Sequence, residues 1–380
     1  MDIIYAKKIN TLNTFQLTDP TLKQFFWKAI SINRELLSSH KRVAYFFIDP
    51  LMNHFEAANR FYFDILECEA VSKFNSYRSG AGPIMALSDA RELIEGDLYD
   101  AVYIFGCEPL LTDTDNYGKD AIKKAMAIFD GTSLVESYNL LAHQICSTLD
   151  LPKQQFLAIS NKLYENYLST YHQNYGSNIN PKRGRFLDDL KADLFRLSDC
   201  ANPNVDFAGG LIVVNPSTAV DLGIPGDARI QVMSSRYNVV KGHPDNITRM
   251  VGEKDHIFPH LREAFVAAQN DSQIDVVQEF LNADLLLEVY TCYPPTPIAF
   301  LLSTGMITDI SELLSFLDDH HITITGGLNL AKAPWNNPVL NSLADMVERM
   351  KRDAVQYGLV HGNGGLGEVQ GVTILKNYLP

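Results

Sequence analysis

The segment NSYRSGAGPIMALSDARELIEGDLYDAVYIFGCEPL, residues 75–110, contains a glycine-rich loop, a helical pattern and an apolar strand pattern in direct succession. The helical pattern covers 82–96, and the strand pattern DAVYIFG covers 100–106. The strand is apolar on both faces, as a strand buried between two layers of helices must be. This succession predicts an α/β fold.

Similar strand patterns recur along the chain and alternate with helical patterns, for example at 256–269 and 337–353. In the second of these helices, Asn337 is a good N-cap and Pro338 suits the first helical position. Alternation of this kind predicts largely parallel sheets. The other predicted strands are 42–49, 209–215, 228–234, 283–290, 321–325 and 371–376.

The two halves of the chain follow one plan, because each has a strand, a glycine-rich loop, a long helix and a further strand with a glycine near its end. The middle, about 112–200, is instead polar and helical. A length of 380 residues suits two domains or one large duplicated unit. We therefore predict an N-terminal half at 1–215 that carries an inserted loop domain at about 112–200, and a C-terminal half at 216–380.

The charge and cysteine content of the chain argue against several kinds of binding partner. The formal net charge of -13 argues against nucleic acid and anionic membrane. The sequence has no apolar run of about 18 residues and no signal-peptide pattern at its start. The five cysteines are scattered without a CxxC spacing, which argues against disulfides and a zinc site. We expect a cytoplasmic protein that acts on a small molecule and holds no metal.

Four segments, in chain order, resemble thiolases. Residues 75–110 resemble the segment around the reactive cysteine, and 205–224 resemble the mid-chain "DGA" strand. Residues 283–307 resemble the "DCF" segment of the sterol-carrier-type branch, and 322–350 together with 357–372 resemble a branch with a GGPGNN-like loop. The resemblance implies the thiolase fold, in which two similar αβα halves form a five-layered αβαβα core, normally in a dimer.

The resemblance also implies a chemistry. In such enzymes a thiolate at a helix N-terminus takes an acyl group from a thioester, and a histidine activates the thiolate. A coenzyme A thioester would then be a substrate, and no bound cofactor is expected.

The reactive cysteine position of thiolases falls on Ser79. A serine hydroxyl is far less acidic than a thiol and requires a strong neighbouring base. Ser79 is therefore either a nucleophile or donor to an acyl oxygen, or a small residue that caps a helix in a degenerate site.

The family's histidine in the 323–343 loop falls on Ala333. Trp335 stands where the family has a small residue, so it either fills the acyl channel or packs at a loop contact. Asn337 and Gly327 of the same loop are further candidates for binding substrate.

The second reactive cysteine falls on Gly362. His361 beside it is a candidate base or an ordinary hydrogen-bonded residue, and Asn363 with the amide of Gly364 could form an anion-binding nest. Cys292, in YTCYPP, is a candidate at the site or a small buried apolar residue.

Two candidates come from the middle of the chain. His143 lies in a segment that resembles the loop-domain helix, where some relatives carry an active-site histidine, although a surface or core role is the alternative. The basic run at 182–185 could meet the phosphates of coenzyme A or be a solvated loop.

Two classes of function follow. The first is a thiolase-like acyltransferase subunit that transfers a short acyl group to or from a small-molecule acceptor, with formation or cleavage of a carbon–carbon bond, inside a multi-subunit complex. The second is a non-catalytic scaffold subunit. The resemblance to the thiolase-type subunit of bacterial acylphloroglucinol-type acyltransferase complexes of secondary metabolism implies a homodimer, or a hetero-oligomer with a ketosynthase-like subunit and a small OB-fold protein.

Overall fold

The computed structural model describes residues 1–11, 20–52, 58–59, 62, 73–127, 132–178, 186–187, 191–241, 250–254 and 256–378. These residues form a nine-stranded sheet in the order β3-β2-β4-β7-β1-β8-β11-β10-β9. Its strands are β1 (Asp2–Thr11), β2 (Val43–Ile48), β3 (Phe74–Tyr77), β4 (Ala101–Pro109), β7 (Asp206–Val214), β8 (Ile230–Val239), β9 (Leu285–Glu288), β10 (Tyr357–Gly364) and β11 (Val369–Asn377).

The two halves of this sheet pair their strands in the same pattern. In the first half β2 is parallel to β4, which is antiparallel to β7, which is antiparallel to β1. In the second half β9 is parallel to β10, which is antiparallel to β11, which is antiparallel to β8. The halves join where Asp2 and Ile3 of β1 pair with Gln231 and Ile230 of β8. This repeated pattern is what an internal duplication produces.

The expectation of largely parallel sheets is wrong. Five pairings among the described strands of this sheet are antiparallel and three are parallel. The reason is clear at β10 and β11, which are joined by a tight turn at 365–368. Such a turn can connect only antiparallel neighbours, because a parallel pair needs a long crossover.

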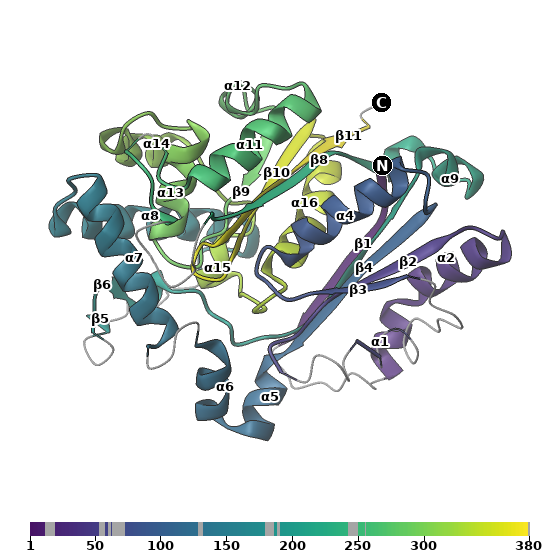
Figure 1. Cartoon of the computed structure of the whole chain (residues 1–380), viewed down its shortest axis with the longest axis horizontal. Coiled ribbons are helices and arrows are strands. Elements are labelled where there is room, and N and C mark those ends of the chain that lie inside the picture. The colour runs from purple at the N-terminus through teal and green to yellow at the C-terminus, as the bar shows by residue number, and fades with distance from the viewer. Residues whose placement is uncertain are drawn as a thin grey trace.

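Two helices form a layer between the halves, as Figure 1 shows. These are α4 (Gly82–Glu95) and α16 (Pro338–Asp353), and each contacts strands of both halves. Helix α2 (Trp27–Ser38) covers the outer face of the first half, and α11 (Pro259–Ser272) covers that of the second. The layers therefore run helix, sheet, helix, sheet, helix, as predicted.

Apolar packing explains this arrangement. One face of α16 is buried in the central cluster together with the inner face of α4. Each large apolar side chain removed from water contributes about 1.5–3 kcal/mol. The buried residues of this face are Val339, Leu343, Met346, Val347 and Met350.

The segment between β4 and β7 is mostly helical in its described residues. It contains α5 (Leu110–Tyr117), α6 (Lys119–Met126), α7 (Leu134–Thr148), α8 (Lys153–Tyr175), β5 (Phe186–Leu187) and β6 (Ala192–Arg196). Helices α7 and α8 pack against elements of the second half, namely α13 (Pro295–Thr304), α14 (Leu313–Asp319) and α15 (Gly327–Leu330). The remaining α-helices among the described residues are α1 (Pro20–Phe25), α9 (Pro216–Asp221) and α12 (Val276–Leu281). The predicted boundaries of the halves and of the insertion stay predictions.

One predicted strand, 321–325, is irregular backbone. Its amides are satisfied by a side chain, because the buried carboxylate of Glu288 accepts hydrogen bonds from the N–H groups of Ile324 and Thr325 at 2.7 and 3.1 Å. The other six predicted strands are confirmed as β2, β4, β7, β8, β9 and β11.

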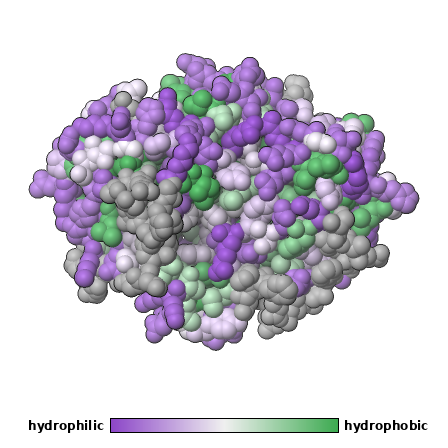
Figure 2. Space-filling model, viewed as in Figure 1, coloured by the Kyte–Doolittle hydropathy of each residue, from purple (hydrophilic) through white to green (hydrophobic). Residues whose placement is uncertain are grey.

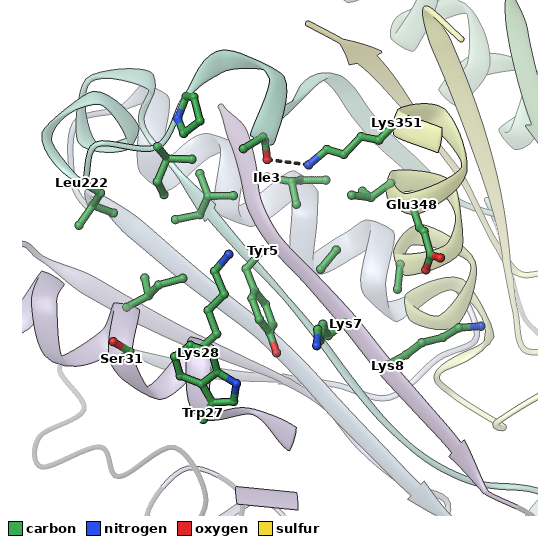
Figure 3. A pocket seen from close by; sticks show the side chains of 18 of the residues that line it. Ile3, Tyr5, Lys7, Lys8, Trp27, Lys28, Ser31, Leu222, Glu348 and Lys351 are labelled. Carbon is green, nitrogen blue, oxygen red and sulfur yellow. Dashed lines mark hydrogen bonds between the residues drawn. The ribbon is translucent and has the colours of Figure 1, made fainter. Parts of the chain in front are cut away.

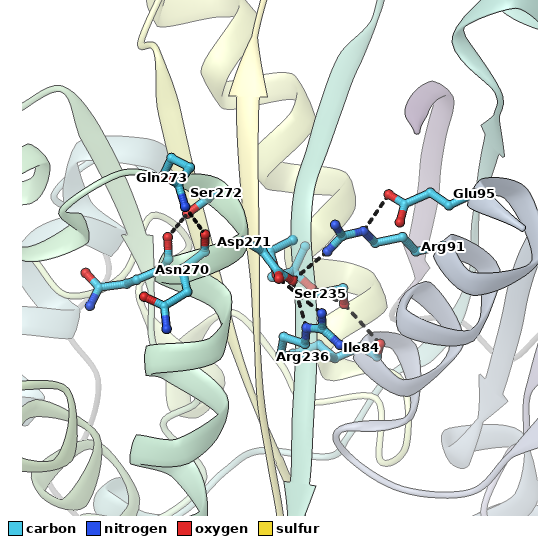
Figure 4. Close-up of polar contacts among 12 residues, drawn as sticks. Ile84, Arg91, Glu95, Ser235, Arg236, Asn270, Asp271, Ser272 and Gln273 are labelled. Carbon is cyan, nitrogen blue, oxygen red and sulfur yellow. Dashed lines mark hydrogen bonds and ion pairs between the residues drawn. The ribbon is translucent and has the colours of Figure 1, made fainter.

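An ion-pair cluster ties α4 to the second half (Figure 4). Asp271 of α11 accepts hydrogen bonds from Arg236 of β8 and Arg91 of α4, both at 2.7 Å. Arg91 also bonds Glu95 one turn further along its own helix. The hydrogen bonds from Arg236 and Arg91 lower the pKa of Asp271 to about 2, against the effect of burial.

The surface of the molecule is mostly polar on the face shown in Figure 2, where the coloured residues place hydrophobic side chains in small separate groups. Among the described residues, no helix combines the length and apolar character needed to cross a bilayer.

Candidate active site

A pocket of about 370 Å³ lies at the N-terminal end of α4. Its wall combines the turn before α4, the loop after β9, the loop before α16 and the end of β10 with residues of α6 and α7. These segments are far apart in the sequence and come from both halves and from the insertion. The pocket is therefore a product of the tertiary structure.

Two glycines allow the turn before α4 to touch the end of β10. A Cβ atom on Gly80 would lie 2.3 Å from the carbonyl oxygen of Asn363 and 2.6 Å from the hydroxyl of Tyr290. A Cβ atom on Gly364 would lie 2.0 Å from the hydroxyl oxygen of Ser79. No side chain fits at either place, which explains the glycine-rich loop at this point of the sequence.

Ser79 lines the pocket and is partly buried. Its hydroxyl oxygen accepts a hydrogen bond from the Ala81 N–H at 3.2 Å. Ala81, and not Ser79, is the N-cap residue of α4. Ser79 thus occupies the predicted position beside the helix start, and its role as a nucleophile or donor stays a prediction.

Cys292 is buried in the pocket wall among neutral groups. Its sulfur lies 3.4 Å from the Tyr138 hydroxyl and 3.3 Å from the Thr296 hydroxyl. Burial raises the pKa of the Cys292 thiol to about 11. The thiol is therefore protonated near neutral pH, whereas a nucleophilic cysteine requires a thiolate.

His361 lies beneath the pocket, on β10, and is only 1% exposed. Its Nδ1 accepts a hydrogen bond from the Tyr290 N–H at 3.3 Å, and its Nε2 lies 2.8 Å from Oε1 of Gln370. The ring packs against Phe300, with centroids 4.6 Å apart. Burial lowers the pKa of His361 to about 4, so the imidazole is neutral and both its nitrogens are already engaged.

Asn363 connects this buried histidine to the pocket. Its side-chain oxygen accepts a hydrogen bond from Nε2 of Gln370. Its amide nitrogen donates to the Tyr138 hydroxyl at 2.9 Å and lies 4.0 Å from the Cys292 sulfur. Asn363 therefore lines the pocket with the N–H side of its amide.

Trp335 lines the apolar side of the pocket and packs with Leu51 and Met126. Its φ of 32° is left-handed, which is uncommon for a bulky residue. Strained backbone of this kind often accompanies binding sites.

Four other candidates lie outside the wall of the pocket. The Asn337 amide is buried and donates to the carbonyl oxygen of Cys107 at 3.2 Å, and Asn337 is the N-cap of α16 without using its side chain for that purpose. Gly327 packs against Thr291 and Tyr167. Gly364 lies against the hydroxyl of Ser79.

His143 is the fourth. It is exposed on α7, where its Nε2 lies 2.8 Å from Asp193 at a separate surface hollow. The structure thus brings Ser79, Cys292, Trp335 and Asn363 to one pocket and leaves His143 away from it. The basic run at 182–185 lies outside the described residues.

Sequence reasoning missed three tyrosines in the wall, Tyr138, Tyr290 and Tyr293. The hydroxyl of Tyr138 donates to the Gly365 carbonyl oxygen at 2.9 Å. The hydroxyl of Tyr290 has no hydrogen-bond partner among the described residues, and burial raises its pKa well above the ordinary value. The available signal was position: Tyr290 belongs to the same YTCYPP run as Cys292, and Tyr138 lies on the helix that carries His143.

A larger groove, of about 820 Å³, lies on the outer side of β1 between α2 and α16 (Figure 3). It is lined by Tyr5 and by four lysines, Lys7, Lys8, Lys28 and Lys351. The Lys351 ammonium donates to the Ala228 carbonyl oxygen at 2.6 Å. None of the predicted site residues lines this groove, so volume alone does not identify the active site.

No protein-family model and no curated protein matches the sequence. Among solved structures, the chain is similar to a monomeric SCP2-thiolase-like protein of type 1 from Mycobacterium smegmatis, at 16% identity and a TM-score of 0.67, over 99% of this chain and 77% of that one. It is similar to human mitochondrial 3-ketoacyl-CoA thiolase at 13% identity and a TM-score of 0.67, over 99% and 98% of the two chains. It is also similar to an Ltp2–ChsH2(DUF35) aldolase at 13% identity and a TM-score of 0.62, over 88% and 87%.

At identities this low, the structural similarity shows the fold alone. The chain is an α/β protein whose two similar halves enclose a central layer of two helices. That architecture is the thiolase fold, and the fold predicted from the sequence is confirmed.

Proposed function

We propose that the protein is a thiolase-like acyltransferase subunit that binds a short acyl thioester in the pocket at the start of α4 and makes or breaks a carbon–carbon bond to the acyl group. The observation that carries the proposal is the convergence of Tyr290, Cys292 and Asn363 on one pocket beside Ser79. The names of two structural neighbours, a 3-ketoacyl-CoA thiolase and an aldolase, support it.

The protonation of the pocket favours a route without an acyl-enzyme. Burial raises the pKa of Tyr138, Tyr290 and Cys292, so these groups keep their protons at neutral pH. The Tyr138 proton goes to the Gly365 carbonyl oxygen and Cys292 bonds Tyr138 and Thr296, which leaves the Tyr290 hydroxyl as the donor for a ligand. Fixed donors in a dry pocket stabilise the negative charge that develops on a carbonyl oxygen. In the direction of bond formation, an acidic C–H of the acceptor gives its proton to solvent, the resulting carbanion forms a bond to the thioester carbon, and the carbon–sulfur bond breaks. Coenzyme A leaves as a thiolate that takes up a proton from solvent. The hydroxyl of Tyr290, which has no hydrogen-bond partner among the described residues, suits the role of donor to the thioester oxygen.

The proposal includes a partner. The name of the Ltp2–ChsH2(DUF35) aldolase joins two components, which supports assembly with a second protein for this chain as well. A ketosynthase-like subunit and a small OB-fold protein are the partners implied by the sequence resemblance.

The test starts from the protein co-purified with its partners from the native host. Release of free coenzyme A from acetyl-CoA is measured in the presence of small diketone acceptors, together with the intact mass of the chain. We expect turnover without a stable acyl adduct, and a loss of about 100-fold or more in the Tyr290→Phe variant, as for loss of one oxyanion donor. An adduct on Ser79 or Cys292 would replace this route with a covalent one, and failure of the complex to bind acetyl-CoA would refute the function.

A specific observation favours the second candidate, a non-catalytic scaffold. Both nitrogens of His361 are occupied by the protein, and among the described residues the hydrogen-bond partners of Cys292 are the neutral groups of Tyr138, Thr296 and Asn363. A scaffold predicts that Tyr290→Phe leaves the activity of the whole complex unchanged. The same experiment therefore separates the two functions.

A further inference from the structure

We infer that His361, acting through Gln370, fixes the amide of Asn363 so that its N–H side faces the pocket and donates to the carbonyl oxygen of the bound ligand. The identity of that ligand as an acyl thioester rests on the proposed function. The orientation of the amide rests on the hydrogen bonds alone.

The chain of hydrogen bonds has only one consistent direction at His361. The backbone N–H of Tyr290 can only donate, so the Nδ1 atom of His361, 3.3 Å away, must accept. A neutral imidazole with an accepting Nδ1 carries its proton on Nε2. That proton is donated to Oε1 of Gln370 at 2.8 Å.

The orientation of the Gln370 amide in turn fixes the orientation of the Asn363 amide. Because Oε1 of Gln370 accepts from His361, its NH₂ group provides the donors, which go to Oδ1 of Asn363 and to the Gly367 carbonyl oxygen at 3.2 Å. Gln370 is fully buried, so its amide does not reach bulk water. The oxygen of the Asn363 amide is therefore engaged behind the wall, and its NH₂ group faces forward.

The forward side of Asn363 has a donor to spare. One N–H reaches the Tyr138 oxygen at 2.9 Å, and this oxygen is free to accept because the Tyr138 proton goes to Gly365. The other N–H has the Cys292 sulfur at 4.0 Å, the outer limit for a hydrogen bond to sulfur. A buried donor that lacks a good acceptor is costly, and the oxygen of a thioester would satisfy it.

Asn363 is thus the ligand-binding residue, and His361 and Gln370 are positioning residues. The arrangement also accounts for a buried histidine that no proton-transfer role explains. Its function is to choose, through its own tautomer, which end of an amide faces the ligand.

The first experiment reads the tautomer directly in the full-length protein. Nitrogen-15-labelled histidine is incorporated, and the imidazole resonances are recorded between about pH 6 and pH 8, with His361 assigned by its loss in His361→Gln. We expect a neutral ring protonated on Nε2. A ring protonated on Nδ1, or a charged ring, would overturn the relay whatever the ligand is.

The second experiment compares two probes that differ by one oxygen. Acetyl-CoA has the carbonyl, and S-ethyl-coenzyme A lacks it. Asn363→Asp keeps the shape of the side chain but removes the N–H donors, and we expect acetyl-CoA to bind about tenfold more weakly while S-ethyl-coenzyme A is unaffected. Asn174→Asp, outside the pocket, is the matched control and should change neither affinity.

A neutral variant guards against misfolding and against the added charge. Gln370→Met keeps a similar volume but removes the link between His361 and Asn363, so the same selective loss of acetyl-CoA binding is expected. Equal losses for both probes, or no loss, would overturn the inference. If the wild-type complex binds neither probe, the proposed function and the ligand part of this inference both fail, while the tautomer measurement still decides the relay.

Discussion

The two central helices begin in opposite ways. Before α4 the chain runs Ser-Gly-Ala-Gly, and before α16 it runs Trp-Asn-Asn-Pro. Each start meets the end of a strand from the other half: Gly80 touches the backbone of Asn363 on β10, and Asn337 bonds the backbone of Cys107 on β4. At α4 the contact is possible because glycine has no side chain. At α16 the contact is a hydrogen bond from the side chain of Asn337.

Both helix starts line the pocket, but they are built differently. At α16 the space is filled by two buried amides, since Asn336 donates to the carbonyl oxygen of Asp49 at 2.9 Å and Asn337 donates to Cys107. At α4 the glycines allow the backbone to touch the end of β10, and Ser79 and Gly80 line the pocket. The two helix starts thus contribute to one pocket by different means: backbone contact at α4, and side chains held by hydrogen bonds at α16.

The insertions differ as well. In the first half the segment between β4 and β7 contributes α6 and α7, which form one side of the pocket. In the second half the corresponding connection between β10 and β11 is the short turn at 365–368. The pocket therefore has a floor from the second half and a wall from the insertion.

The strongest way to break the comparison is to give the α4 start a side chain. In Gly80→Val the new atoms would overlap the Asn363 carbonyl and the Tyr290 hydroxyl, so we expect a loss of about 3 kcal/mol in the free energy of unfolding, together with loss of acetyl-CoA binding. Urea denaturation and calorimetry measure the two effects. Gly226→Ala is the control, because a Cβ atom there meets nothing within 4 Å. Normal stability of Gly80→Val would mean that the close approach is not required.

The second test removes the amide at the α16 start. Asn337→Ala leaves the buried carbonyl oxygen of Cys107 without this donor, and we expect a loss of about 1–2 kcal/mol in the free energy of unfolding without a change in ligand affinity. Asn238→Ala, whose amide donates to the exposed Glu263, should cost much less. A change in affinity would show that the two helix starts are coupled.

The third test concerns the ion pairs that hold α4 to the second half. The pKa of Asp271 in the folded protein is about 2, below its unfolded value of about 3.9. Its stabilisation is therefore complete above the unfolded pKa and is lost as the pH falls through the folded pKa. We expect Asp271→Asn to cost about 1 kcal/mol at neutral pH and to flatten the fall in stability between about pH 4 and pH 2.

Unfolding free energies over a pH series measure this effect. Glu263→Gln, on the same helix but more exposed, should leave the acid dependence intact. Acid curves of the same slope for wild type and Asp271→Asn would contradict the assignment.

The smallest expected effect is a change in the preference for acyl-chain length when Trp335, just before α16, is replaced. Trp335→Gly relieves the left-handed backbone and opens the apolar side of the pocket, so longer acyl-CoA ligands should gain over acetyl-CoA by about fourfold per buried methylene. Competition binding with a series of acyl-CoA lengths measures the gain. An unchanged preference would place Trp335 outside the acyl path.

Local signals in the sequence were sufficient for the elements that bury a continuous apolar pattern. The 82–96 and 337–353 helices and six of the predicted strands rest on periodicity, which depends only on neighbours along the chain. Strand β10 was not predicted, because three of its eight residues are glycines, which weaken strand propensity. It forms through pairing with β9 and β11. Segment 321–325 shows the reverse case: its sequence predicts a strand, but the N–H groups of Ile324 and Thr325 bond the carboxylate of Glu288 instead of a neighbouring strand.

The sequence by itself determined the α/β architecture and brought attention to Ser79, Cys292, Trp335 and Asn363, because buried periodicity and ordered motifs are properties of the chain alone. Only the tertiary structure decided that these residues share a pocket with Tyr138 and Tyr290, and that His361 lies beneath it with both nitrogens occupied. The physical reason is that burial, hydrogen-bond partners and pKa depend on neighbours that the fold brings together from distant segments.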